Sequence, residues 1–201
     1  MQGIPNIISY NTKMVSKELA PKSYDDLLHP RWKNQLGMDE DESEWFAALI
    51  AIWGKDKATT FFRGLSKQAP SLRRGHTLLV HLNAAGEFAI AVNVFGYEVL
   101  NMKNQGAPIE PELAFPVVVR PSYLGVAKHA PHPNAAKLYV DFATSAEGQQ
   151  LWANLGAPVL RSGVKNKYPE LLNNPNVRPV TLDMAKDYNQ VSKLYYSIIG
   201  K

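Results

Sequence analysis

The segment Arg73-Arg74-Gly75-His76-Thr77 combines residue types that bind anions in proteins. An arginine offers a fork of N–H donors to a carboxylate or phosphate group, and a glycine lets a ligand approach the backbone closely. Thr77 is expected to cap the helix that follows, and a helix N-terminus favours negative charge. The segment predicts a site for an anion at Arg74, Gly75, His76 and Thr77. The alternative is a solvated arginine pair beside an ordinary capped helix.

Asn93 and Tyr97 lie around the end of the apolar segment Phe88–Val94, which is typical of a strand buried on both faces. In open α/β domains the carboxyl ends of strands face the ligand crevice. A phenolate oxygen is a hard donor that suits Fe(III), so Tyr97 is the candidate metal ligand. The alternative for Tyr97 is a ring packed on its own helix, with its hydroxyl group in water.

An acidic run, Asp39–Glu44, precedes Trp45. Its carboxylates would attract a cation, but we favour a solvated loop whose charge suits the N-terminus of the following helix. Trp45 fits either the wall of a cleft or the core. Tyr10 and Asn11, which end an N-terminal apolar segment, are further candidates for the same cleft.

The sequence lacks the residue patterns of common enzymes. His76 and His81 are five residues apart and do not share a helix face. There is no His-Glu-x-x-His, Gly-x-Ser-x-Gly or P-loop pattern, and there are no cysteines to act as nucleophiles or zinc ligands. We therefore expect a protein that is not an enzyme and requires no cofactor. A small hydrolase using a His/Asp pair is the enzymatic alternative.

The composition is that of a globular protein, with 201 residues, 45% of them hydrophobic, and a formal net charge of +4. The basic residues form no stripe with interleaved aromatic residues, so a nucleic-acid partner is not expected. The longest apolar run, Phe46–Trp53, is far shorter than the ~20 residues of a membrane helix. The first residues have neither the basic nor the apolar region of a signal peptide.

Hydrophobic periodicity predicts strands alternating with helices, and hence an α/β fold. The expected strands are Ile4–Asn11, Leu36–Met38, Phe88–Val94, Phe115–Val119 and Tyr123–Ala127. The expected helices begin near Trp45, Asp56, Thr77, Phe95, Pro133, Ser145 and Leu182. Asp41 and Glu44 have the spacing of a capping box, and Ser145 is a further predicted cap.

Three stretches occur in a fixed order along the chain. They are Tyr10–Val15 with Tyr24–Lys33, then Arg73–Thr77 with Ala84–Phe88, then Ala130–Phe142 with Ser145–Gln150. Together they resemble extracellular solute-binding proteins of ABC transporters, of the type that binds ferric iron. The resemblance extends over about residues 7–169 and is most specific in the third stretch. It implies a periplasmic protein whose partners are a small-molecule or metal ligand and a permease in the membrane.

The resemblance also implies a type II periplasmic-binding-protein-like α/β fold, in which two lobes are joined by crossover strands and enclose the ligand. Residues 1–11 would be one crossover strand, 12–114 the complete lobe two, 115–119 the return crossover strand, and 120–201 the C-terminal part of lobe one. Family members begin with a long segment that builds most of lobe one, and this chain lacks it. Apolar surface left bare in this way favours association, so we expect a homodimer through the exposed lobe-one surface.

Ferric-binding members of the family place adjacent tyrosines where this sequence has Phe95-Gly96-Tyr97. The resemblance implies capture of iron(III), or of an anionic or iron-complexed small solute, by hinge closure around the cleft. The alternative from another class is a ligand-free structural fragment that associates with itself.

Overall fold

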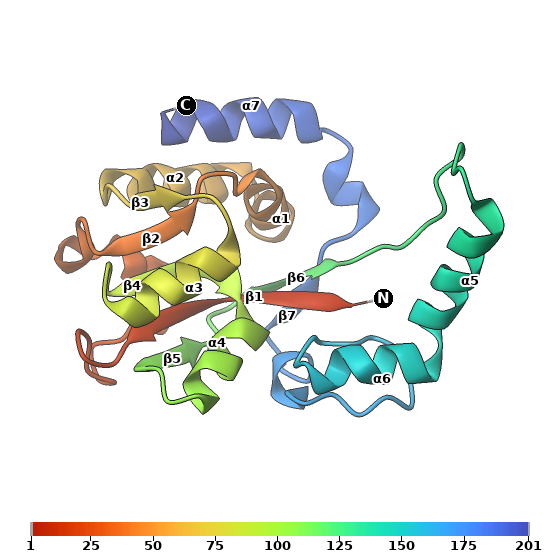
Figure 1. The fold of residues 1–201 in the computed structure, drawn as a ribbon. Helices are drawn as coiled ribbons and strands as arrows, with labels where there is room; N and C mark the ends of the chain where they lie inside the picture. The colour runs from red at the N-terminus through yellow and green to blue at the C-terminus, as the bar shows by residue number, and fades with distance from the viewer. Residues whose placement is uncertain (1, 201) are drawn as a thin grey trace.

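A computed structural model describes residues 2–200, which form one mixed sheet covered by helices (Figure 1). The strands are β1 (Gly3–Asn11), β2 (Leu36–Asp39), β3 (Ser71–Arg73), β4 (Ile90–Phe95), β5 (Ile109–Glu112), β6 (Val117–Pro121) and β7 (Val177–Pro179). Across the sheet they lie in the order β3-β2-β4-β1-β6-β7, and β5 pairs with β1. The predicted α/β class is confirmed.

The α-helices are α1 (Ser43–Trp53), α2 (Lys55–Lys67), α3 (His76–Ala85), α4 (Gly96–Asn104), α5 (Pro133–Thr144), α6 (Ala146–Asn154) and α7 (Tyr188–Ile199). Ser145 caps α6 as predicted, because its Oγ accepts a 3.0 Å hydrogen bond from the Gly148 N–H. Within residues 2–200, no helix is long and apolar enough to cross a membrane.

Two other predicted caps are wrong. Helix α3 begins at His76 with Gly75 in the N-cap position, so Thr77 lies inside the helix. Helix α1 begins at Ser43, and its N-cap residue, Glu42, makes no capping hydrogen bond with its side chain. The Asp41 carboxylate instead accepts a 2.6 Å hydrogen bond from the Ser43 hydroxyl, which replaces the expected capping box.

Strand β1 changes partners along its length. It pairs with β6 through Gly3, Ile4 and Pro5. From Asn6 onward it pairs with β4, and its C-terminal half also pairs with β5. The register with β4 shifts between Ile7 and Ser9, opposite Asn93, which has φ +58°. Asparagine tolerates this left-handed conformation better than most residues, and a bulge of this kind re-aims a side chain.

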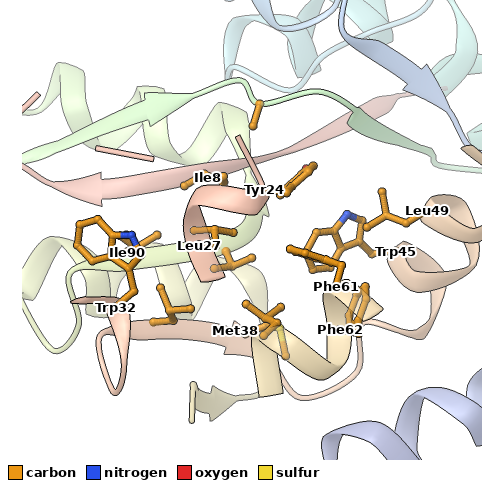
Figure 2. Close-up of a cluster of buried hydrophobic side chains, with 14 of the residues drawn as sticks. Ile8, Tyr24, Leu27, Trp32, Met38, Trp45, Leu49, Phe61, Phe62 and Ile90 are labelled. Atoms are coloured by element: carbon orange, nitrogen blue, oxygen red, sulfur yellow. The ribbon is translucent and has the colours of Figure 1, made fainter. Parts of the chain in front are cut away.

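The core beside the sheet combines aliphatic side chains with a group of packed aromatic rings (Figure 2). Trp45 lies 4.9 Å from Phe62 and 5.4 Å from Tyr24 between ring centroids, and it is buried. Phe61, Phe62 and Leu65 of α2, the helix expected from near Asp56, are buried in the same cluster. Trp45 is therefore a core residue, and it does not form the wall of a cleft.

The strand predictions differ from the structure in two ways. The short strands β3, β5 and β7 were not expected. The segment Tyr123–Ala127, expected to be a strand, has no regular structure, and Tyr123 and Leu124 are exposed. That prediction is wrong because no described strand lies beside the segment to accept its backbone hydrogen bonds.

Helices α5 and α6 pack on each other at the end of the sheet away from β3 (Figure 1). Helix α7 instead contacts α1 and α2, so the last helix lies with residues 12–114. The proposed division into lobes remains a prediction. Several large apolar side chains of α5, α6 and the residue after them are exposed: Leu138, Tyr139, Phe142, Leu151, Trp152 and Leu155.

Candidate ligand-binding crevice at the strand ends

The carboxyl ends of β2, β3 and β4 meet at one edge of the sheet, because these strands are parallel neighbours. The strands end at Asp39, Arg73 and Phe95, and α1, α3 and α4 begin within a few residues of those ends. Helix N-termini carry unbonded N–H groups, and this edge is the usual ligand position in open α/β sheets. We call it the strand-end crevice.

Asp39 already occupies the anion position at the N-terminus of α3. Its carboxylate accepts hydrogen bonds of 2.6 Å from the Gly75 N–H and 2.9 Å from the Asp41 N–H. Asp39 is buried, so this contact is shielded from water. The Gly75 N–H, which belongs to the predicted anion site, is therefore already hydrogen-bonded within the protein.

Glu42 is the buried acid of the crevice. Its Oε2 accepts a 2.6 Å hydrogen bond from the Asn93 side-chain amide, which the bulge in β4 directs toward it. Asn93 is fixed in turn by a 3.1 Å hydrogen bond from the Asn6 amide to its carbonyl oxygen. The other oxygen of the Glu42 carboxyl group, Oε1, has no hydrogen-bond partner in the described part of the chain.

His76 connects Glu42 to Arg120, which lies on β6. Arg120 Nη2 is 2.7 Å from His76 Nε2, and His76 Nδ1 is 3.7 Å from Glu42 Oε1. A guanidinium group only donates hydrogen bonds, so Nε2 must be the acceptor and the ring proton lies on Nδ1. This tautomer points an N–H toward the Glu42 carboxyl group.

The titration behaviour of both groups reflects their burial. Desolvation lowers the pKa of His76 to about 4, and the positive charge of Arg120 acts in the same direction. Desolvation holds the pKa of Glu42 well above its usual range, while Arg120 opposes that rise. His76 is therefore neutral at pH 7, as the geometry of its contact with Arg120 requires.

Arg120 borders an open cavity of about 410 Å³. Its Nη1 is 3.2 Å from Glu44 Oε2, and its guanidinium carbon lies 5.8 Å from the Phe95 ring centroid. The cavity lies between the start of α1, the end of β6 and the segment before α7. It is lined by Glu44, Ala47, Arg120, Pro121, Tyr123, Val180, Thr181, Met184 and Tyr188.

Arg74 and Thr77 are exposed at the edge of the crevice, whereas His76 beside them is buried. Of the predicted segment, the structure therefore directs His76 inward, into the Glu42–Arg120 cluster. Asn93 joins that cluster through Glu42. Trp45 belongs to the core behind it.

Tyr97 is half-buried, and its ring stacks on Phe95 at 5.8 Å. Phe95 also contacts His76, with ring centroids 4.6 Å apart. Burial and the neighbouring Glu98 raise the pKa of Tyr97, which favours its neutral phenol. Over residues 2–200, no group of three or more His, Cys, Asp or Glu side chains is placed to hold a metal ion.

Tyr10 and Asn11 lie at the other end of β1 from its contact with β6, so the structure does not bring them to Arg120. Tyr10 is buried and lines a separate cavity of about 420 Å³ with Lys103 and Glu110. The Asn11 amide donates a 2.7 Å hydrogen bond to the Asn83 carbonyl, and its Oδ1 accepts one from the Lys13 N–H. These contacts hold the turn after β1.

Sequence reasoning missed Asp39, Glu42 and Arg120. The favoured interpretation of the acidic run as a solvated loop is wrong for Asp39 and Glu42, which are both buried. Nothing in a run of acids distinguishes the buried members from the exposed ones. Arg120 carried a usable signal, because it follows directly after an apolar predicted strand, where a polar residue at a strand end is a site candidate.

Comparison with known proteins gives the family. Over residues 2–177, the sequence matches the family described as bacterial extracellular solute-binding protein. An uncharacterized protein of Haemophilus influenzae is 30% identical over 152 residues, which cover 70% of this chain and 43% of that protein. The chain thus spans less than half the length of this curated relative.

Solved structures share the fold over nearly the whole chain. The substrate-binding protein of an ABC transporter from Agrobacterium tumefaciens superimposes with a TM-score of 0.82 at 14% identity, covering 100% of this chain and 66% of that one. Iron-bound HitA from Pseudomonas aeruginosa gives 0.77 at 21% identity, covering 98% and 68%. The periplasmic binding protein AfuA from Actinobacillus pleuropneumoniae, with fructose-6-phosphate bound, gives 0.73 at 22% identity, covering 99% and 65%.

The family match covers most of the chain, and the structural likenesses establish a periplasmic-binding-protein-like fold. Both agree with the resemblance carried by the three sequence stretches. The chain belongs to the bacterial extracellular solute-binding protein family, and it shares its fold with iron-bound HitA and with the ferric ion-binding protein A of Pasteurella haemolytica.

Proposed function

We propose that this chain is the solute-binding part of an ABC importer, which captures a small anionic solute at the strand-end crevice and delivers it to a membrane permease. The observation that carries the proposal is the Arg120 guanidinium, a partly exposed cation beside an open cavity of about 410 Å³. Small-molecule sites combine such a concave, mostly apolar surface with a few convergent polar groups.

Family membership supports the transport role and a location outside the cytoplasmic membrane, in the periplasm. It also supports binding without catalysis, because the matched family is one of binding proteins. Affinity in proteins of two lobes comes from closure of both walls around the ligand. The crevice described for residues 2–200 supplies one wall and Arg120.

An anionic solute fits the crevice better than a bare ferric ion. Tyr97 is stacked on Phe95, and its raised pKa opposes the phenolate form that Fe(III) would require. Arg120 offers N–H donors, which suit oxyanions. Ferric citrate presents carboxylates of the same chemistry, so an iron-complexed anion is included in the proposed ligand class.

Native mass spectrometry of the purified chain tests the proposal. A stoichiometric extra mass, either co-purified or acquired after addition of ferric citrate, inorganic phosphate or fructose-6-phosphate, is the expected result. A spectrum containing only the apo chain under all of these conditions would count against solute binding.

A second candidate function is self-association without a ligand. It is favoured by the exposed apolar side chains of α5 and α6, among them Leu138, Leu151 and Leu155. Contiguous apolar surface of this kind marks interaction sites. Assembly that depends on concentration and does not respond to any solute would support this candidate over the first.

A further inference from the structure

The guanidinium group of Arg120 is held in place without being neutralised by a buried acid. The buried carboxyl group nearby, Glu42, reaches Arg120 only through the neutral His76 ring. The direct acidic partner is Glu44, whose side chain is 57% exposed. An exposed ion pair contributes little free energy, so an incoming oxyanion can displace Glu44 from Arg120 at little cost.

His76 sets the direction of the Arg120 fork. Its Nε2 accepts from Nη2, and the Phe95 ring lies beside the guanidinium group. Arg120 Nη1 donates a hydrogen bond to Glu44, and Arg120 is one of the residues that line the cavity. His76 is thus a positioning residue that acts through Arg120.

The cavity beyond Arg120 has mostly apolar walls. Ala47, Val180 and Met184 form part of its lining, and the rings of Tyr123 and Tyr188 add flat surfaces. The Tyr188 hydroxyl is fixed by a 2.7 Å hydrogen bond with Ser43 Oγ, whereas Tyr123 is 67% exposed. A volume of about 410 Å³ lies within the range of small-molecule pockets.

From this juxtaposition we infer that Arg120 binds the carboxylate or phosphate group of the solute and that the adjoining cavity holds an apolar or aromatic body attached to that group. This inference rests on the proposed function and narrows its ligand class to organic oxyanions. Inorganic phosphate would occupy only the Arg120 end of the site. The exposed Arg74, which the sequence suggested as the clamp, lies outside the lining of this cavity.

Isothermal titration calorimetry with defined probes tests the inference on the full chain. Phenyl phosphate and benzoate carry a body with a phosphate or a carboxylate, and inorganic phosphate carries the anion alone. We expect phenyl phosphate or benzoate to bind more tightly than inorganic phosphate. Arg120→Gln should weaken binding of that probe about tenfold or more, the range expected for a lost charged hydrogen bond.

Four further variants give the controls. Tyr123→Ala, at an exposed position, should weaken phenyl phosphate binding severalfold and leave inorganic phosphate unchanged. Arg74→Gln and Arg178→Gln remove exposed arginines outside the cavity lining and should bind like the wild type. Arg120→Lys keeps the charge but not the fork, so it should bind with intermediate affinity. Unfolding midpoints of all variants establish that each is folded.

The outcomes separate this inference from the proposed function. If the wild type binds a solute and Arg120→Gln binds it equally well, the subsite assignment is overturned while solute binding stands. A loss confined to Arg74→Gln would move the anion site to the start of α3 and would also overturn the assignment. If the wild type binds none of these probes and carries no solute in native mass spectrometry, both proposals fail together.

Discussion

His76 couples protonation to stability, because it is buried as a neutral ring beside a cation. Its pKa in the folded chain, about 4, is below the ordinary value near 6.5, so its stabilising contribution is present above pH 6.5 and is lost as the pH falls toward 4. We expect this group to account for a decrease of up to about 3 kcal/mol in the free energy of unfolding across that window.

Denaturant unfolding at pH 7, 5.5 and 4 measures this contribution. His76→Gln should show a smaller decrease than the wild type, because glutamine does not titrate. His129→Gln, at an exposed loop position, is the matched control and should follow the wild-type curve. Equal slopes for the wild type and His76→Gln would contradict the assignment.

Glu42 makes the free energy of unfolding depend on pH in the opposite direction. Burial raises its pKa, so the folded chain favours the protonated acid, and the free energy of unfolding falls as the pH rises through the ordinary glutamate range and toward the raised pKa. Glu42→Gln keeps an acceptor for the Asn93 amide and removes the buried charge. We expect it to be more stable than the wild type by about 1 kcal/mol or more at pH 8, and to lose that advantage at pH 4.

The comparison variant for this prediction is Glu44→Gln, which changes an exposed acid two residues away. Its free energy of unfolding should differ little from that of the wild type at either pH. A gain of the same size in both variants would mean that surface charge, and not the burial of Glu42, is responsible.

At the scale of elements, the corner between α5 and α6 depends on the absence of a side chain at Gly148. A Cβ atom there would lie 2.2 Å from the Phe142 carbonyl oxygen, which belongs to the backbone and cannot rotate away. Gly148→Ala should therefore lower the free energy of unfolding by roughly 1–3 kcal/mol, measured by chemical denaturation.

Gly125→Ala is the matched control, because a Cβ at Gly125 meets no atom within 4 Å. It should leave stability nearly unchanged. If Gly148→Ala also left stability unchanged, α6 would have to move relative to α5 to make room for the methyl group. That result would contradict the tight packing at this corner.

Elements with a strong period were predictable from the sequence. The helix expected from near Asp56 corresponds to α2, and the apolar run ending at Val94 corresponds to β4. The short strands β3 and β5 were not predictable, because three or four residues give no period, and β5 contains Pro111, which is unusual in strands. Tyr123–Ala127 has strand-forming residues, but a strand needs a neighbour that only the tertiary fold supplies.

The site was predictable in part for a related reason. The strand ends and helix starts in the sequence were enough to predict the edge of the sheet that holds the site. His76 and Asn93, which were predicted there, lie in the buried cluster at that edge. Glu42 and Arg120 are 78 positions apart in the sequence. Their meeting depends on where β6 lies beside β1, which no local pattern encodes.

For the whole molecule, the exposed apolar surface of α5 and α6 predicts association. We expect sedimentation velocity to show a homodimer whose fraction rises with concentration, because burying Leu138 and Leu155 against a second copy removes apolar area from water. The double variant Leu138→Glu with Leu155→Glu should shift the chain toward monomer. Leu19→Glu, also exposed but distant in sequence, should not, and a wild type that is monomeric at all concentrations would exclude the dimer.

The exchange of partners along β1 has a mechanical consequence. Pro5 pairs with Val119 of β6, and the next residue, Asn6, pairs with Phe95 of β4, so one strand is fastened to two different neighbours on either side of a single peptide bond. The Asn6 side-chain amide also donates a hydrogen bond to the Asn93 carbonyl of β4, next to this junction. Backbone pairing and two side-chain hydrogen bonds thus connect β6, through β1 and Asn93, to the buried Glu42, so a displacement of β6 relative to β4 would load these contacts directly.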